Sequence, residues 1–68
     1  MVVHEDIEQA LEEKVGIYAV AERQGEVITL SGLIGSDAER DRALAIAAAM
    51  APGKRIVDNL ELATVVAA

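Results

Sequence analysis

Residues 27–39, with the sequence VITLSGLIGSDAE, decide the fold of this 68-residue chain. The first part belongs to a predicted strand over residues 26–34, because apolar side chains alternate with smaller or polar ones at Ile28, Leu30 and Ile34. Gly32 lies on the same apolar face. Glycine on a buried strand face is typical of a bulge or of a close approach by another backbone. We expect the approaching backbone here to be a helix.

The second part of the stretch predicts the start of a helix. Ser36, followed three residues later by Glu39, forms a capping box, in which both side chains satisfy unpaired backbone N–H groups. We expect this helix to run to about Ala51, because alanine, the best helix former, dominates it and Pro52-Gly53 stops it. Its thin apolar stripe consists of Ala43, Ile46, Ala47 and Met50.

Upstream of this stretch, the pattern predicts a helix and a first strand. Apolar side chains recur every four residues and acidic ones crowd the first turn, so we expect a helix from about Glu5 to Val15. Residues 17–23 predict a strand, which a turn at Gln24-Gly25 connects to the strand over residues 26–34.

Downstream, residues 55–62 predict a third strand. Asp58 falls on the same face of this strand as the apolar residues, so we expect a bulge at Asp58 or a partner for its side chain. The order helix, strand, strand, helix, strand predicts an α+β two-layer sandwich. We expect a three-stranded mixed sheet with two helices on one face. Residues 1–68 are predicted to form a single domain with its core at about residues 4–62.

These residues resemble a BON domain, the small module named after bacterial osmotic-shock and nodulation proteins. The run 28–34, ITLSGLI, is similar to the family's apolar-x-Leu-x-Gly-x-apolar pattern, and RALAIA at 42–47 to its Ala-x-x-Ile-Ala. Pro52-Gly53 and the run 56–62, IVDNLEL, look like its closing glycine and last strand. Lys54 follows Gly53 directly, where the family has an apolar residue.

The resemblance implies a non-enzymatic binding module that associates with phospholipid or membranes at the bacterial envelope, with a link to osmotic stress. It implies no catalytic residue and no cofactor. The partners it implies are phospholipid or a membrane-associated protein. We expect a periplasmic or envelope location if the chain is excised from a secreted parent, and a cytoplasmic one if it is the full chain.

Composition excludes several classes of function. The chain carries 12 acidic and 6 basic side chains, which give a net charge of -6, and it has one aromatic residue and no cysteine. Disulfides and cysteine-based metal or redox sites are therefore excluded, and no metal ligand set is predicted. Nucleic acid is a poor fit, because its phosphates attract Lys and Arg and its bases stack on aromatic rings.

Two sets of residues are candidates for binding. Phosphate headgroups suit basic side chains, and arginine matches their geometry, so the lipid-headgroup candidates are Arg40, Arg42, Lys54 and Arg55. If both helices cover one face of the sheet, the other face is open and carries apolar side chains among polar ones. The candidates on this face are Ile17, Val27, Thr29, Val57 and Asn59, with Ala19 and Ser31 beside them.

The residues alone favour the alternative to lipid binding, a protein–protein or self-association module that uses this open face. Its partner is a second copy or a tandem sister domain. The edge of the last strand is a second place for a partner, by strand addition. A third hypothesis, a cation-responsive module, depends on the acidic surface.

Overall fold

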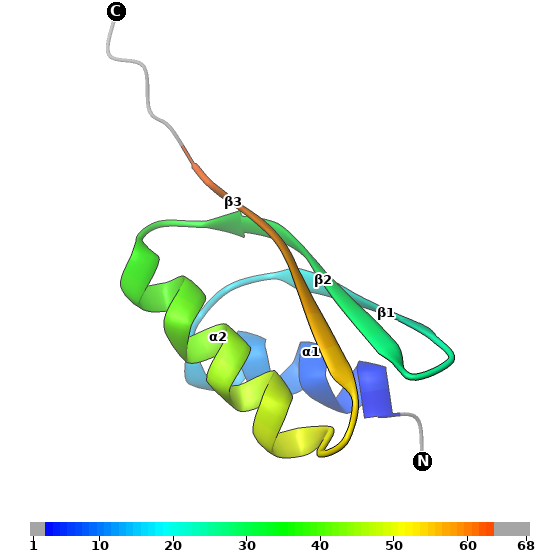
Figure 1. Ribbon diagram of the computed structural model, residues 1–68. Coiled ribbons are helices and arrows are strands. Elements are labelled where there is room, and N and C mark those ends of the chain that lie inside the picture. The colour runs from blue at the N-terminus through cyan, green and yellow to red at the C-terminus, as the bar shows by residue number, and fades with distance from the viewer. Residues whose placement is uncertain (1–2, 64–68) are drawn as a thin grey trace, which may run out of the picture.

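The computed structural model describes residues 3–63, which form an α+β domain with the predicted order of elements (Figure 1). The predictions for residues 1–2 and 64–68 lie outside the described residues. The elements are α1 (Val3–Lys14), β1 (Ala19–Gln24), β2 (Val27–Ile34), α2 (Asp37–Met50) and β3 (Arg55–Leu62).

The helix α1 forms because its apolar residues fall on one face, where Ile7 and Leu11 are fully buried. Glu5 and Asp6 in its first turn and Lys14 in its last turn complement the helix dipole. Gly16, with φ of +84°, ends it as predicted, and the Gly16 N–H donates to the Leu11 carbonyl at 3.0 Å.

The sheet has the order β1-β2-β3. β1 pairs with β2 antiparallel, and β2 pairs with β3 parallel, with α2 as the crossover between them. The first turn is Gly25-Glu26 rather than the predicted Gln24-Gly25, since Gln24 still pairs with Val27. Gly25 adopts φ of +62°, which a short hairpin turn demands of its first residue.

The start of α2 confirms the capping box with one difference. The Glu39 N–H donates to the Ser36 hydroxyl at 3.2 Å. The Glu39 carboxylate accepts from the N–H of Gly35 at 2.8 Å, one residue before the cap. Both hydrogen bonds tie the β2–α2 connection to the first turn of α2.

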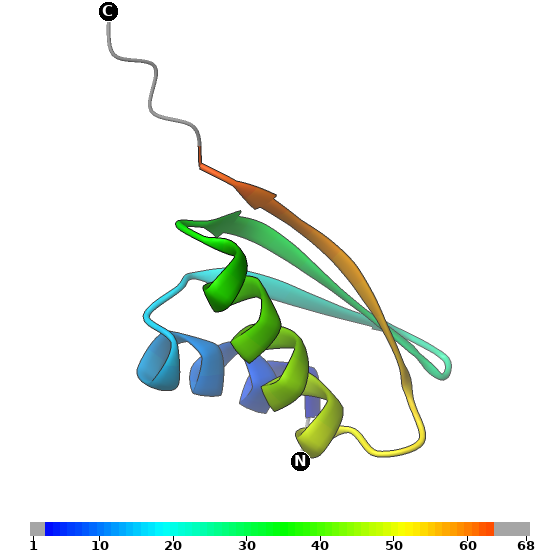
Figure 2. The same ribbon diagram turned by 60° about the vertical axis from the view of Figure 1, so that its left-hand side comes forward.

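Both helices cover the same face of the sheet (Figure 2), with α1 mainly on β1 and α2 mainly on β3. The core between the two layers is made of small and branched apolar residues and has no aromatic side chain. Its buried members are Ile7, Leu11, Ile17, Ala21, Ile28, Leu30, Ile34, Ala43, Ala47, Ala51 and Leu60.

The face assignment predicted for the first strand is wrong. Ile17 is 5% exposed and lies in the core, and Ala19 packs against it, whereas Tyr18 and Val20 are exposed. The observed turn sets the register so that Ala21 pairs with Leu30, whereas the predicted turn would pair it with Ile28. Both registers pair odd-numbered residues of β1 with even-numbered residues of β2, so either turn places Ile17 and Ala19 on the buried face.

Two further expectations are corrected. The backbone close to Gly32 belongs to the neighbouring strand and not to a helix, since a Cβ there would lie 3.0 Å from the Tyr18 carbonyl oxygen. Asp58 lies in an unbroken register between β2 and β3, so there is no bulge at it. The partner that we expected as the alternative is present, because Arg40 pairs with Asp58.

Candidate interaction surface

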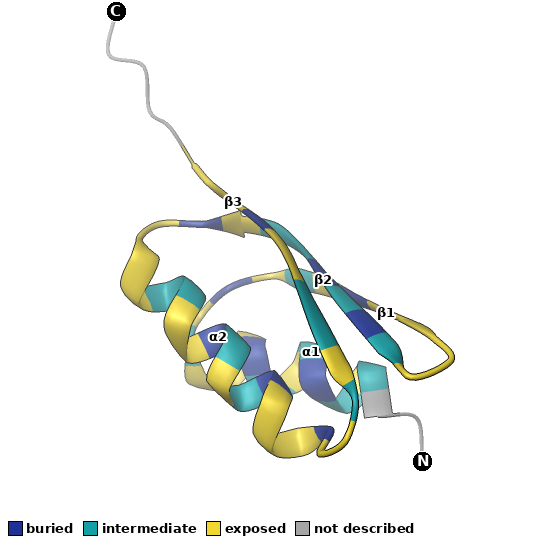
Figure 3. Ribbon diagram, in the orientation of Figure 1, coloured by how far each residue is buried: buried dark blue, intermediate teal, exposed yellow. Residues whose placement is uncertain are grey.

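No helix among the described residues covers the second face of the sheet, which we call the open face. Figure 3 shows exposed and intermediate segments along the strands, interrupted by buried residues. Alternation from the buried residues assigns to the open face Val20, Glu22 and Gln24 of β1, Val27, Thr29, Ser31 and Leu33 of β2, and Arg55, Val57, Asn59 and Glu61 of β3.

Three large apolar side chains are exposed together at one end of this face. Tyr18 is 81% exposed, Leu33 63% and Val20 52%. Val20 pairs with Ser31, so it lies diagonally across the strands from Leu33, and Tyr18 comes directly before β1 beside the end of β2. We call these three residues the Tyr18–Leu33 patch.

The patch borders an open groove of about 560 Å³. Its floor and walls come from the loop before β1, the end of β2 and the start of α2. The lining residues are Gly16, Ile17, Tyr18, Gly32, Leu33, Ile34, Gly35, Glu39 and Ala63. This arrangement suits an apolar side chain of a partner more than a charged group, since Glu39 is the one charged residue in the lining.

The structure brings most of the predicted face residues together. Val27, Thr29, Val57 and Asn59 all lie on the open face, and Ile17 does not. Sequence reasoning missed the three residues of the Tyr18–Leu33 patch. The two-residue turn was the available signal, because it pairs even-numbered residues of β1 with odd-numbered residues of β2, which lie on the open face.

The four lipid-headgroup candidates do not form a cluster. Arg40 pairs with Asp37 at 3.0 Å and with Asp58 at 3.2 Å. Arg42 donates to the Lys14 carbonyl at 2.9 Å, where it caps the C-terminus of α1.

The other two candidates lie at the start of β3. Lys54 pairs with Glu26 at 3.2 Å. Arg55, on the open face, is the one candidate whose side chain has no ion pair or hydrogen bond within residues 3–63. Three of the four cations therefore already contact carboxylates or a carbonyl of their own chain.

Neither a metal-binding cluster nor a membrane-spanning helix is present in the described part of the chain. Residues 3–63 hold no group of three or more His, Cys, Asp or Glu side chains arranged to bind a metal ion. None of the helices described is both long enough and apolar enough to cross a membrane.

The chain is a two-layer αββαβ domain in which one face of the sheet is uncovered among the described residues. The family model of the BON domain matches residues 3–64, nearly the whole chain, so the chain belongs to the BON family. BON domains are generally non-catalytic binding modules. No curated protein matches the chain.

Proposed function

We propose that this BON domain binds a second copy of itself through the open face. The observation that carries the proposal is the Tyr18–Leu33 patch, in which three large apolar side chains are exposed side by side on a face that neither helix covers. Removing such a patch from water stabilises a complex, and patches of this kind mark contact surfaces.

The charges of the open face favour a second copy as the partner. Arg55 and Glu61 lie on this face at opposite ends of β3, and neither side chain has an ion pair among the described residues. In the proposed dimer the open faces of two copies pack against each other. The two-fold axis lies midway between the two sheets and perpendicular to the strands, so β3 of one copy lies antiparallel over β3 of the other. Each Arg55 then lies over Glu61 of the second copy.

On β2 the same axis pairs apolar side chains. Leu33 and Val27 lie at opposite ends of the open face of β2, so Leu33 of one copy lies over Val27 of the other. Face-to-face packing of two sheets also gives a small domain a second apolar layer. A chain of this length without disulfides gains stability from such an association.

Association with phospholipid at the bacterial envelope is the competing function, and the BON resemblance implies it. It needs cations that are free to meet headgroups, and Arg40, Arg42 and Lys54 are each held by an oxygen of this chain. The net charge of -6 also opposes attraction to an anionic surface. We therefore favour self-association over lipid binding.

The test is a sedimentation-velocity series on the chain, first alone and then with vesicles that contain phosphatidylglycerol. We expect a concentration-dependent monomer–dimer equilibrium without vesicles and no co-sedimentation with them. Leu33→Asp should make the protein monomeric, because it buries a charge against Val27 of the second copy. Met50→Asp is the matched control, since Met50 is also exposed but lies on α2, away from the open face.

A charge reversal gives the sharper result. Arg55→Glu should weaken the dimer, and the double variant Arg55→Glu/Glu61→Arg should restore it, because the two residues exchange roles across the axis. A wild-type chain that stays monomeric at all concentrations contradicts the proposal. If that monomer pellets with vesicles, phospholipid association is the better account.

A further inference from the structure

The sheet has two outer edges, because its strand order is β1-β2-β3. An outer edge presents unpaired N–H and C=O groups, on which a strand of another chain can pair. On β1, the N–H of Ala21 donates to the Glu8 carboxylate of α1 at 2.7 Å. A side chain of the first helix thus covers the middle of this edge.

The outer edge of β3 follows from its pairing with β2. The Arg55 N–H donates to the Glu26 carbonyl at 2.8 Å, and the Ala63 N–H donates to the Ile34 carbonyl at 2.8 Å. Alternate residues of a strand bond the same neighbour, so the odd-numbered residues of β3 face β2. The even-numbered residues direct their N–H and C=O groups outward.

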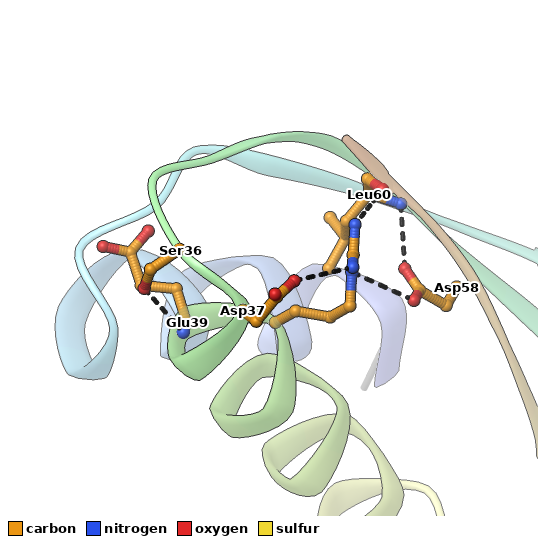
Figure 4. Close-up of polar contacts among 6 residues, drawn as sticks. Ser36, Asp37, Glu39, Asp58 and Leu60 are labelled. Carbon is orange, nitrogen blue, oxygen red and sulfur yellow. Dashed lines mark hydrogen bonds and ion pairs between the residues drawn. The ribbon is translucent and has the colours of Figure 1, made fainter. Parts of the chain in front are cut away.

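The outward N–H and C=O groups of Leu60 both form hydrogen bonds with side chains of the same chain (Figure 4). The Leu60 N–H donates to Asp58 Oδ1 at 3.0 Å, and the Leu60 carbonyl accepts from Arg40 Nη2 at 3.1 Å. Arg40 Nε lies 3.2 Å from Asp58 Oδ2, an ion pair that joins the two side chains. We call Arg40 and Asp58 the edge latch.

A second copy of the chain is the occupant that this edge fits best. When β3 pairs antiparallel with β3 of a second copy so that Arg55 lies opposite Glu61, two pairs of unlike charges form. Unlike charges directly across neighbouring strands stabilise the pairing. The charges of β3 therefore favour one register of edge-to-edge pairing.

The edge latch blocks that register in two ways. Ile56 of the second copy would lie opposite Leu60 and would need its N–H and C=O groups, which the latch already occupies. Asp58 would lie opposite Asp58 of the second copy, and like charges there repel. We propose that the edge latch keeps β3 from pairing edge-to-edge with a second copy, which leaves the open face for docking.

The test removes the latch in a chain that cannot associate through the open face. The starting variant is Leu33→Asp, so the result does not depend on whether face pairing occurs. Arg40→Met/Asp58→Ala is added to it, where methionine keeps the aliphatic stem of Arg40 and alanine removes the carboxylate. Sedimentation velocity should shift from a monomer to a dimer or larger species. Circular dichroism verifies that the fold is kept.

Asp37→Asn in the same background is the matched control. It removes the second ion pair of Arg40, with Asp37, and leaves Leu60 covered, so this variant should stay monomeric. If Arg40→Met/Asp58→Ala is folded and stays monomeric, the latch is only a structural ion pair and the proposal is wrong. Association of the Asp37→Asn control to the same extent also contradicts it.

Disulfide cross-linking shows where two β3 strands meet, and it provides a second test if Arg40→Met/Asp58→Ala folds poorly. The chain has no cysteine, so one introduced thiol can form only an intermolecular disulfide. In the favoured register the two positions 58 lie opposite each other, within the reach of a disulfide. Arg40→Met/Asp58→Cys should form a disulfide dimer faster than Asp58→Cys alone. Equal rates would show that Arg40 does not close the edge.

Discussion

At Gly32 the backbone has φ of +148°, and a Cβ there would lie 3.0 Å from the Tyr18 carbonyl oxygen and 3.1 Å from the Cα of Ala19. Both neighbours are backbone atoms, which cannot move aside without shifting β1. Gly35 differs, because a Cβ there would first meet the flexible carboxylate of Glu39 at 3.4 Å. The space beside Gly32 therefore permits no side chain, whereas the space beside Gly35 permits a small one.

The residue-scale prediction is that Gly32→Ala destabilises the domain by roughly 1–3 kcal/mol, the cost of a residue held in an unfavourable backbone conformation. Gly35→Ala is the control and should change the free energy of unfolding by less than about 1 kcal/mol. Urea denaturation followed by circular dichroism measures both. Equal effects of the two substitutions would contradict the account of Gly32.

The basic residues of this chain have structural roles at the same scale. Arg42 caps α1, Arg40 covers the edge of β3, and Lys54 pairs with Glu26. Sequence spacing alone gave no sign of these contacts, because their partners lie 20 and 28 residues away along the chain.

Among the elements, α2 shows how small side chains set the distance between the layers. Ala43 and Ala47 are fully buried where this helix faces the core. A methyl group fills the gap between helix and sheet, so the backbone of α2 lies close to the strands. Interiors are packed densely, and a longer side chain at either position has no space.

The element-scale prediction follows from this close packing. Ala47→Leu should destabilise the domain by about 1–3 kcal/mol, because overpacking forces the helix away from the sheet. Ala45→Leu is the matched control, since Ala45 is exposed on the same helix and leucine has a helix propensity similar to that of alanine. Its free energy of unfolding should lie within about 0.5 kcal/mol of the wild-type value. Thermal denaturation of both variants measures the difference in stability. If Ala47→Leu is as stable as the wild type, the account of close packing between α2 and the sheet is wrong.

For the whole molecule, charge decides how association responds to salt. Each copy carries a net charge of -6, so two copies repel each other over a distance that the ionic strength sets. The Debye length is about 10 Å at 0.1 M salt and about 3 Å at 1 M. We expect this long-range repulsion, which acts over all the charges, to outweigh the two Arg55–Glu61 pairs proposed at the contact.

The prediction at this scale is that added salt strengthens face-to-face association. The dissociation constant from sedimentation equilibrium should fall several-fold between about 0.01 M and 0.3 M salt, as repulsion is screened. Choline chloride is the control and should act like potassium chloride. An effect of potassium that choline does not reproduce would contradict screening and support a cation-responsive module.

Much of the fold was predictable from local signals. The alternation at Ile28, Leu30 and Ile34, the capping box at Ser36 and the stop at Pro52-Gly53 each act over a few neighbouring residues. The third strand was predicted with its observed bounds, Arg55–Leu62. The order of the elements then left few arrangements in which both helices bury their apolar faces against the sheet.

The face of β1 was predicted wrongly, although the hairpin pairing specifies it. Turns at Gln24-Gly25 and at Gly25-Glu26 both place Ile17 on the face of Leu30, so the prediction of Ile17 on the open face did not agree with the predicted turn. The Tyr18–Leu33 patch was missed for this reason. Four of the five face candidates were unaffected, because the face of β2 and β3 follows from their own apolar alternation.

The sequence by itself determined the elements, their order and the family, since propensity, capping and alternation depend on residues close along the chain. Tertiary structure alone decided which cations are engaged. The pairing of Arg40 with Asp58 and of Arg42 with the end of α1 arises only when distant segments pack together. The docking surface depends on these long-range contacts, and for that reason only the folded domain reveals it.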